Sequence, residues 1–159
     1  KGLSMVSKEV GKSVELELNL KYTYPLGQWE PYFRGLKAGR AIASKCTTCG
    51  RTWFAPRLDC PEHGASVTWV QLSGAAQVVS VTVTQSRLPF CTESVPTAFA
   101  LVALHGAENL AFARLSNVPK SDLTDQTVWI SRDSGQWVHP SQAACYVLSE
   151  KDRLQEPWP

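Results

Sequence analysis

The chain has 159 residues, of which 43% are hydrophobic and 19% are charged, and its formal net charge is +2. This composition is ordinary for a folded chain and argues against a disordered class and a membrane class. No apolar run approaches the roughly 20 residues that span a bilayer, and the beginning of the chain lacks the apolar region of a secretory signal. Five cysteines, with one close pair, fit a reducing compartment better than a secreted disulfide framework, so we expect a cytoplasmic protein.

Residues 1–27 are predicted to form an N-terminal arm. Within it, residues 14–24 read VELELNLKYTY, where apolar and polar side chains alternate as in a half-buried strand or an extended arm. Residues 28–40 then place aromatic and leucine side chains at three- and four-residue spacing. Because Pro31 suits the first turn of a helix, this segment predicts a short amphipathic helix.

A candidate metal site follows the predicted helix. Cys46 and Cys49 are separated by two residues, and Cys60 and His63 repeat that spacing. Thiolate and imidazole are the ligands that tetrahedral zinc prefers, and the glycine after each pair permits a tight turn. We therefore expect a structural zinc ribbon with these four residues as ligands. The alternatives are a site that has lost its metal and a redox-active C-x-x-C pair, which would need a βαβ context that the predicted elements do not supply.

Residues 67–148 are predicted to form a small antiparallel barrel. Turn residues separate several short apolar runs, and no long helix interrupts them. The first run directs Val79, Val81 and Val83 to one face, and the second and third form a hairpin around Gly106. Residues 119–125 are compatible with a helical turn, and a polar tail is expected at 149–159. The predicted strands are 77–85, 97–105, 109–115, 127–131 and 143–148.

The stretch between Pro31 and Leu58 carries six basic residues and no acidic one. It is either a solvated basic face or a surface that meets phosphates or an acidic partner. The same region is rich in aromatic side chains that a small ribbon cannot all bury. These are candidates for a protein interface, unless they pack between the helix and the barrel. The basic candidates are Arg34, Lys37, Arg40, Lys45, Arg51 and Arg57, and the aromatic candidates are Trp29, Tyr32, Phe33, Trp53 and Phe54.

The sequence predicts no active site of its own. His105, His139 and Cys91 stand outside any nucleophile elbow, glycine-rich phosphate loop or acidic cluster. Cys145, like most cysteines outside a cluster, is expected to be a small buried hydrophobe. We therefore expect no catalytic residues in this chain.

A set of motifs in a fixed order resembles the DUF35 family. The resemblance covers residues 28–131 and implies an N-terminal helix with a rubredoxin-like zinc ribbon at 28–66, followed by an OB-fold at 67–148. His63 stands where the family usually has a fourth cysteine. The motifs are Tyr32-Phe33-Arg34-Gly35-Leu36, the two metal-ligand pairs, Pro56-Arg57, residues 69–74 (WVQLSG), and the runs 78–83 and 95–104.

The resemblance also implies a function. DUF35 proteins resemble small subunits that associate with thiolase-fold proteins acting on acyl-CoA. These include aldolases that cleave steroid side-chain CoA esters, acyl transferases and the 2-benzoylsuccinyl-CoA thiolase of anaerobic toluene degradation. The expectation is a non-catalytic, zinc-binding accessory subunit in a hetero-oligomer with a thiolase-like catalytic subunit. The substrate of the complex would be a CoA ester, whose phosphates the basic stretch could meet.

Two other functions remain open at this point. A single-stranded nucleic-acid-binding module is the main alternative, because OB-folds and zinc ribbons commonly bind single strands. Such a module needs aromatic platforms among basic residues, whereas the strands are expected to present Ser80, Thr82, Thr84 and Ala100. A structural interaction protein with no CoA role is the other alternative.

Overall fold

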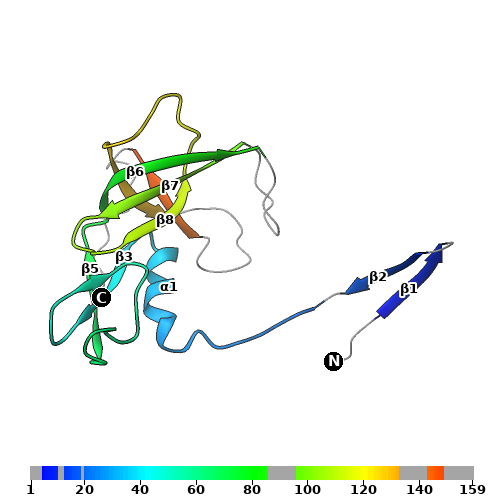
Figure 1. The fold of residues 1–159 in the computed structure, drawn as a ribbon, viewed down its shortest axis with the longest axis horizontal. Helices are drawn as coiled ribbons and strands as arrows, with labels where there is room; N and C mark the ends of the chain where they lie inside the picture. Colours follow the sequence, from blue (N-terminus) through cyan, green and yellow to red (C-terminus); the bar gives the residue numbers. More distant parts are fainter. Residues whose placement is uncertain (1–4, 11–12, 19, 86–95, 133–142, 149–159) are drawn as a thin grey trace.

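The computed structural model describes residues 5–10, 13–18, 20–85, 96–132 and 143–148 (Figure 1). The tail at 149–159, Cys91 and His139 lie outside the described residues. The described part is mostly β, with one short α-helix, as the sequence predicts. No helix in these ranges is long and apolar enough to cross a membrane.

The N-terminal arm is a β-hairpin followed by an extended segment. Strands β1 (Met5–Val10) and β2 (Ser13–Leu18) pair antiparallel and lie away from the rest of the molecule (Figure 1). Of the two alternatives for residues 14–24, the strand holds as far as Leu18 and the extended arm describes residues 20–24. The alternation continues to Tyr24, but residues 20–26 pair with no strand in the described part of the chain, and alternation alone does not make a strand without a hydrogen-bonding neighbour.

The predicted helix is present but shorter than the segment 28–40. A 3-10 turn, η1 (Gly27–Trp29), precedes α1 (Glu30–Lys37). The helix buries one face, with Leu36 fully buried. Its neighbours approach closely at two glycines, where a larger residue would clash. A Cβ on Gly35 would lie 2.3 Å from Ile42 Cγ1, and a Cβ on Gly39, just after the helix, would lie 2.5 Å from the backbone nitrogen of Arg132. The helix is thus held between the ribbon sheet and the barrel.

We call residues 41–72 the ribbon. Its three-stranded sheet has the order β4 (Thr52–Trp53), β3 (Ala41–Cys46), β5 (Val67–Leu72), and both pairs are antiparallel. The boundary expected at residue 66 between the ribbon and the barrel would assign β5 to the barrel. In the structure, β5 instead pairs along its full length with β3 of the ribbon sheet.

The second sheet closes into a five-stranded barrel. Its order is β10-β8-β7-β6-β9, and its interior includes Val78, Val102, Leu104, Ile130 and Tyr146. Four of the neighbouring pairs are antiparallel, but β10 and β8 run parallel, so the purely antiparallel expectation is wrong for the pair that closes the barrel. The arrangement is that of the predicted OB-fold. The strands are β6 (Ala75–Thr84), β7 (Thr97–Leu104), β8 (Leu110–Leu115), β9 (Thr127–Arg132) and β10 (Ala144–Val147).

Two local expectations in the barrel are wrong. A bulge between Val78 and Ser80 shifts the register of β6, so Val79 and Ser80 are both exposed, whereas Val81 is partly buried. A bulge adds one residue to one strand, which breaks simple alternation. The segment 119–125 forms bends and a turn instead of a helical turn. Its Asp122 carboxylate accepts hydrogen bonds from the amide and hydroxyl of Thr124, which compete with helical bonding.

The turn between β7 and β8 joins the barrel to the ribbon. The Asn109 side chain accepts a hydrogen bond from the amide of Phe54 (2.9 Å) and donates one to the Phe54 carbonyl (2.7 Å). Beside it, the amide of Glu108 donates to the carbonyl of Thr52 (2.9 Å). Three hydrogen bonds therefore attach β4 and the residue after it to a barrel hairpin distant in sequence.

Candidate metal centre

Two loops of the ribbon have the same backbone geometry. In the first, the amide of Cys46 donates to the carbonyl of Arg51 (2.8 Å), and the amide of Gly50 donates back to the carbonyl of Cys46 (3.1 Å). In the second, the amide of Cys60 donates to Ala65 and that of Gly64 to Cys60, at 3.1 and 2.8 Å. Both glycines have positive φ, 75° and 55°, which explains why glycine ends each loop.

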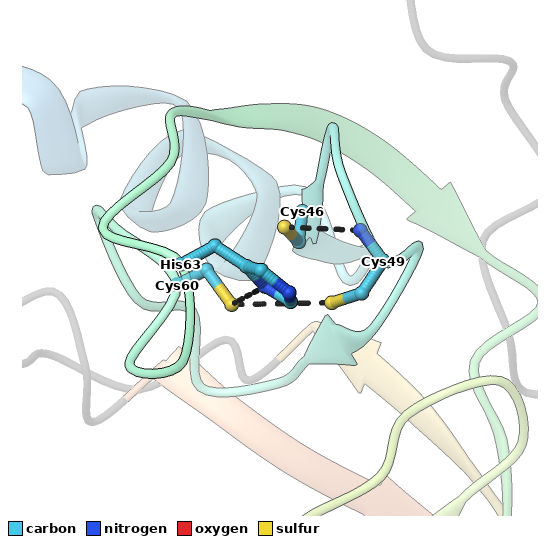
Figure 2. Close-up of side chains that lie close together, drawn as sticks. All are labelled: Cys46, Cys49, Cys60 and His63. Atoms are coloured by element: carbon cyan, nitrogen blue, oxygen red, sulfur yellow. Dashed lines mark hydrogen bonds between the residues drawn. The ribbon is translucent and has the colours of Figure 1, made fainter.

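The two loops bring the four predicted ligands together. Figure 2 shows the side chains of Cys46, Cys49, Cys60 and His63 directed toward one another. One ligand atom from each lies within 4.8 Å of all the others, with Cys49 Sγ 3.9 Å from Cys60 Sγ and Cys60 Sγ 3.2 Å from His63 Nδ1. Cys46 and Cys60 are buried, and Cys49 and His63 are exposed. The group could hold a metal ion.

The electrostatics of the cluster suit bound thiolates. The amides of Cys49 and Thr48 donate to Cys46 Sγ at 3.4 and 3.3 Å and lower the pKa of that thiol. Cys49 differs. The amide of Arg51 lowers its pKa, but desolvation and the adjacent thiols of Cys46 and Cys60 raise the pKa by a larger amount, so the net shift is upward. Crowded thiols resist ionising together unless a cation offsets their charge, and a divalent metal is such a cation.

The six basic residues are placed in different surroundings. Arg51 makes ion pairs with Glu62 of the second loop and with Glu108 of the barrel hairpin, the latter at 3.4 Å. Lys45 is exposed on β3, and a Cβ on Gly50 would lie 3.7 Å from its Cε. On α1, Arg34 pairs with Glu30 at 3.6 Å, and Lys37 is exposed. Of the remaining two, Arg57 is exposed and Arg40 partly buried.

The aromatic candidates also divide. Tyr32, Trp53 and Phe54 are 8%, 7% and 3% exposed. The expectation that aromatic side chains around the ribbon stay exposed at the surface is therefore wrong for these three. Tyr32 and Phe54 pack edge to face between the helix and the barrel core, with ring centroids 5.6 Å apart. Trp29 and Phe33 stay partly exposed.

The barrel presents an aromatic pair that the sequence reasoning missed. Phe99 of β7 and Phe112 of β8 stack on the outer face, with centroids 5.2 Å apart and planes 11° from parallel. Phe112 is 62% exposed, whereas Ala100, which was expected on the surface, is fully buried. Alternation does mark both phenylalanines, because each stands between two small buried alanines.

No family model matches the chain, and no curated protein matches its sequence. Its fold, however, is similar to those of solved DUF35 proteins. One is a protein of unknown function from the DUF35 family of Sulfolobus solfataricus (TM-score 0.52, 20% identity, 76% of this chain and 84% of that chain covered). Another is the Ltp2-ChsH2(DUF35) aldolase (TM-score 0.59, 19% identity, 80% of this chain and 98% of that chain covered). The DUF35 fold expected from the motifs is confirmed.

Proposed function

We propose that this chain is a non-catalytic accessory subunit of a thiolase-fold enzyme that cleaves a carbon–carbon bond in an acyl-CoA substrate. The observation that carries the proposal is the fold match to the Ltp2-ChsH2(DUF35) aldolase, which extends over 98% of that chain. The match covers 80% of this chain, whereas the barrel from β6 to β10 makes up less than half of the chain, so the likeness extends beyond the barrel.

We propose further that the metal is Zn²⁺ and that its role is structural. Three thiolates and one imidazole form a donor set typical of zinc. Four protein ligands leave no open position for water or substrate, so the ion would stabilise the ribbon and take no part in bond cleavage. This chain would then help to form the substrate channel and stabilise its partner, and the catalytic groups would belong to the partner.

Co-expression with a thiolase-fold protein encoded beside this chain tests the proposal. We expect a stable hetero-oligomer that cleaves an acyl-CoA ester, and no cleavage by this chain alone, because a thiolase-type reaction needs a nucleophile or base and oxyanion donors. The partner alone should be poorly active or unstable. Full cleavage by the partner alone, or the absence of any complex, would contradict the proposal.

One observation favours a second function, the binding of single-stranded nucleic acid. The stacked pair Phe99 and Phe112 lies on the strands with which OB-folds commonly contact oligonucleotides. Against it, Arg114 is the only described cation on β6, β7 and β8. A fluorescently labelled oligothymidine should therefore bind weakly or not at all; tight binding that Phe112→Ala abolishes would favour this second function.

A further inference from the structure

A shallow apolar groove of about 510 Å³ runs along the outer side of the helix. It is lined mainly by Tyr24, Leu26, Trp29, Tyr32, Phe33 and Ala55. These residues come from three separate segments: the end of the arm, the helix, and the ribbon loop after β4. The groove is therefore a product of the tertiary structure.

The floor of the groove is rigid and aromatic. The Tyr32 ring lies 6.4 Å from that of Trp29, 5.3 Å from that of Phe33 and 5.6 Å from that of Phe54, measured between centroids. Burial raises the pKa of Tyr32 to about 12, so its hydroxyl stays neutral at physiological pH. A preformed aromatic floor of this kind is typical of the anchoring pockets at protein interfaces.

One end of the groove is basic. A smaller hollow lined by Leu26, Glu30, Phe33, Arg34 and Lys37 shares two residues with the groove and continues it. Glu30, the only carboxylate that lines this hollow, pairs with Arg34 at 3.6 Å, so the net positive charge of the hollow comes from the exposed Lys37. An occupant with carboxylates beyond its apolar part would match this distribution of charge.

The exposed apolar surface continues from the groove along the arm. Leu20, Tyr22 and Tyr24 are 51%, 77% and 58% exposed, on an extended segment that leads away from the helix (Figure 1). Small-molecule pockets bury most of their ligand, which an open groove continued by an exposed strip does not do. A long, open apolar surface instead suits a segment of another protein.

We propose that this groove docks an apolar segment of the thiolase-fold catalytic subunit, with a carboxylate of that segment lying against Lys37. The proposal rests on the accessory-subunit function and gives that function a binding surface. It assigns Lys37 to contact with the partner, in place of contact with CoA phosphates.

The test measures the dissociation constant of the complex with the co-expressed thiolase-fold protein, by biolayer interferometry. Phe33→Ala and Tyr24→Ala should each weaken binding about tenfold or more, as removal of an aromatic anchor does. Lys37→Glu should weaken binding at low salt, and the difference from the native chain should shrink at high salt. The KM for the acyl-CoA should stay unchanged in whatever complex forms.

Phe112→Ala is the matched control, because it removes an exposed phenylalanine of the barrel that does not line the groove. It should leave the dissociation constant unchanged, and Tyr24→Ala, on the extended arm, should leave the melting temperature unchanged. If the native chain binds and the groove variants bind equally well, the groove proposal is wrong and the accessory function stands. If Lys37→Glu raises KM without weakening the complex, the basic end meets CoA instead. If the native chain does not bind, both proposals fail.

Discussion

The four candidate metal ligands are not equivalent at the scale of single residues. Cys46 and Cys60 are buried at the start of their loops, and each accepts backbone hydrogen bonds at its carbonyl that define the loop. Cys49 and His63 stand exposed at the outer side of the cluster. Loss of a buried ligand therefore removes both a metal bond and part of the loop's packing.

We expect Cys46→Ser and Cys60→Ser to abolish metal binding, and His63→Ala to weaken it less, because three thiolates would remain. Elemental analysis of the purified protein should find about one zinc per chain in the native sequence. Cys145→Ala, which changes a buried cysteine of the barrel, should retain the metal. Zinc at full occupancy in Cys60→Ser would contradict the assignment, and so would a native protein that contains iron or no metal.

Asn109 is a second residue with a specific role. Its side chain makes two hydrogen bonds to the backbone of the buried residue Phe54. Asn109→Ala should lower the free energy of unfolding by about 1–3 kcal/mol, because it leaves buried backbone groups without partners. Asn117→Ala, an exposed asparagine with one 3.4 Å contact to Ser116, should change it by less than about 0.5 kcal/mol. Denaturant titration of both variants measures the difference, and equal effects would show that the Asn109 link carries no special weight.

Two buried tyrosines make stability depend on alkaline pH. Burial raises the pKa of Tyr32 from 10.0 to about 12, and it raises the pKa of Tyr146 as well. Both stay protonated in the folded chain while the unfolded chain ionises, so their contribution is complete below pH 10 and is lost as the pH rises above 10; for Tyr32 the loss continues to about pH 12. The free energy of unfolding should fall over this window. In Tyr32→Phe the fall should be smaller, and an unchanged fall would contradict the linkage.

At the scale of elements, the helix α1 connects the ribbon to the barrel. Its N-terminal half contacts Phe54 through Tyr32, and its C-terminal end meets the last residue of β9. Gly39 makes that end possible for two reasons: its φ is +69°, and a Cβ there would lie 2.5 Å from the backbone nitrogen of Arg132.

Gly39→Ala and Gly27→Ala separate these two reasons. Both glycines have positive φ, but a Cβ on Gly27 would meet nothing within 4 Å. Gly27→Ala should cost about 1 kcal/mol from backbone strain alone. Gly39→Ala should cost a further 1–3 kcal/mol, roughly, because backbone must move to relieve the clash. Thermal or chemical unfolding measures both, and equal losses would mean that the helix end does not press on the barrel.

At the scale of the whole molecule, the metal loops and the barrel are linked at the turn between β7 and β8. Arg51 pairs with Glu108, and the hydrogen bonds at Thr52 and Phe54 complete this link. The metal loops have a small core of their own around Cys46, Trp53 and Cys60. Other ribbon residues, among them Ala41, Ala43 and Phe54, belong to the main core with the barrel. The two parts should therefore respond differently to loss of the metal.

Strong chelation should increase amide hydrogen exchange in residues 42–66 and leave β7 and β8 protected, because binding energy in such ribbons is folding energy. The turn at 105–109 should lose part of its protection, since its partners lie in the ribbon. Mass spectrometry of exchanged peptides measures all three regions. Uniform loss of protection would show instead that the ribbon and the barrel unfold as one unit.

The sequence by itself determined the four residues of the Cys/His cluster that could hold a metal, the helix and the order of the barrel strands. These are local properties: ligand spacing, glycine after each loop, three- and four-residue periodicity, and apolar runs between turns. The DUF35 resemblance added the OB-fold, but the parallel pairing of β10 with β8, which closes the barrel, was not expected. Binary alternation was insufficient where a bulge displaced Val79 and where residues 20–26 lacked a neighbouring strand.

Only the tertiary structure decided which aromatic and basic residues share a surface. Tyr32 and Phe54 became buried because the helix and the barrel core approach from opposite sides, whereas Phe33 and Trp29 were left along the groove. Arg51 forms ion pairs with Glu62 and Glu108, whereas Lys37 lies at the basic end of the groove. Yet both basic residues belong to the same acid-poor stretch between Pro31 and Leu58. The reason is physical, because burial and ion pairing depend on which segments pack together. In this protein, Glu62 and Glu108, which are 11 and 57 positions from Arg51 along the chain, both meet its side chain.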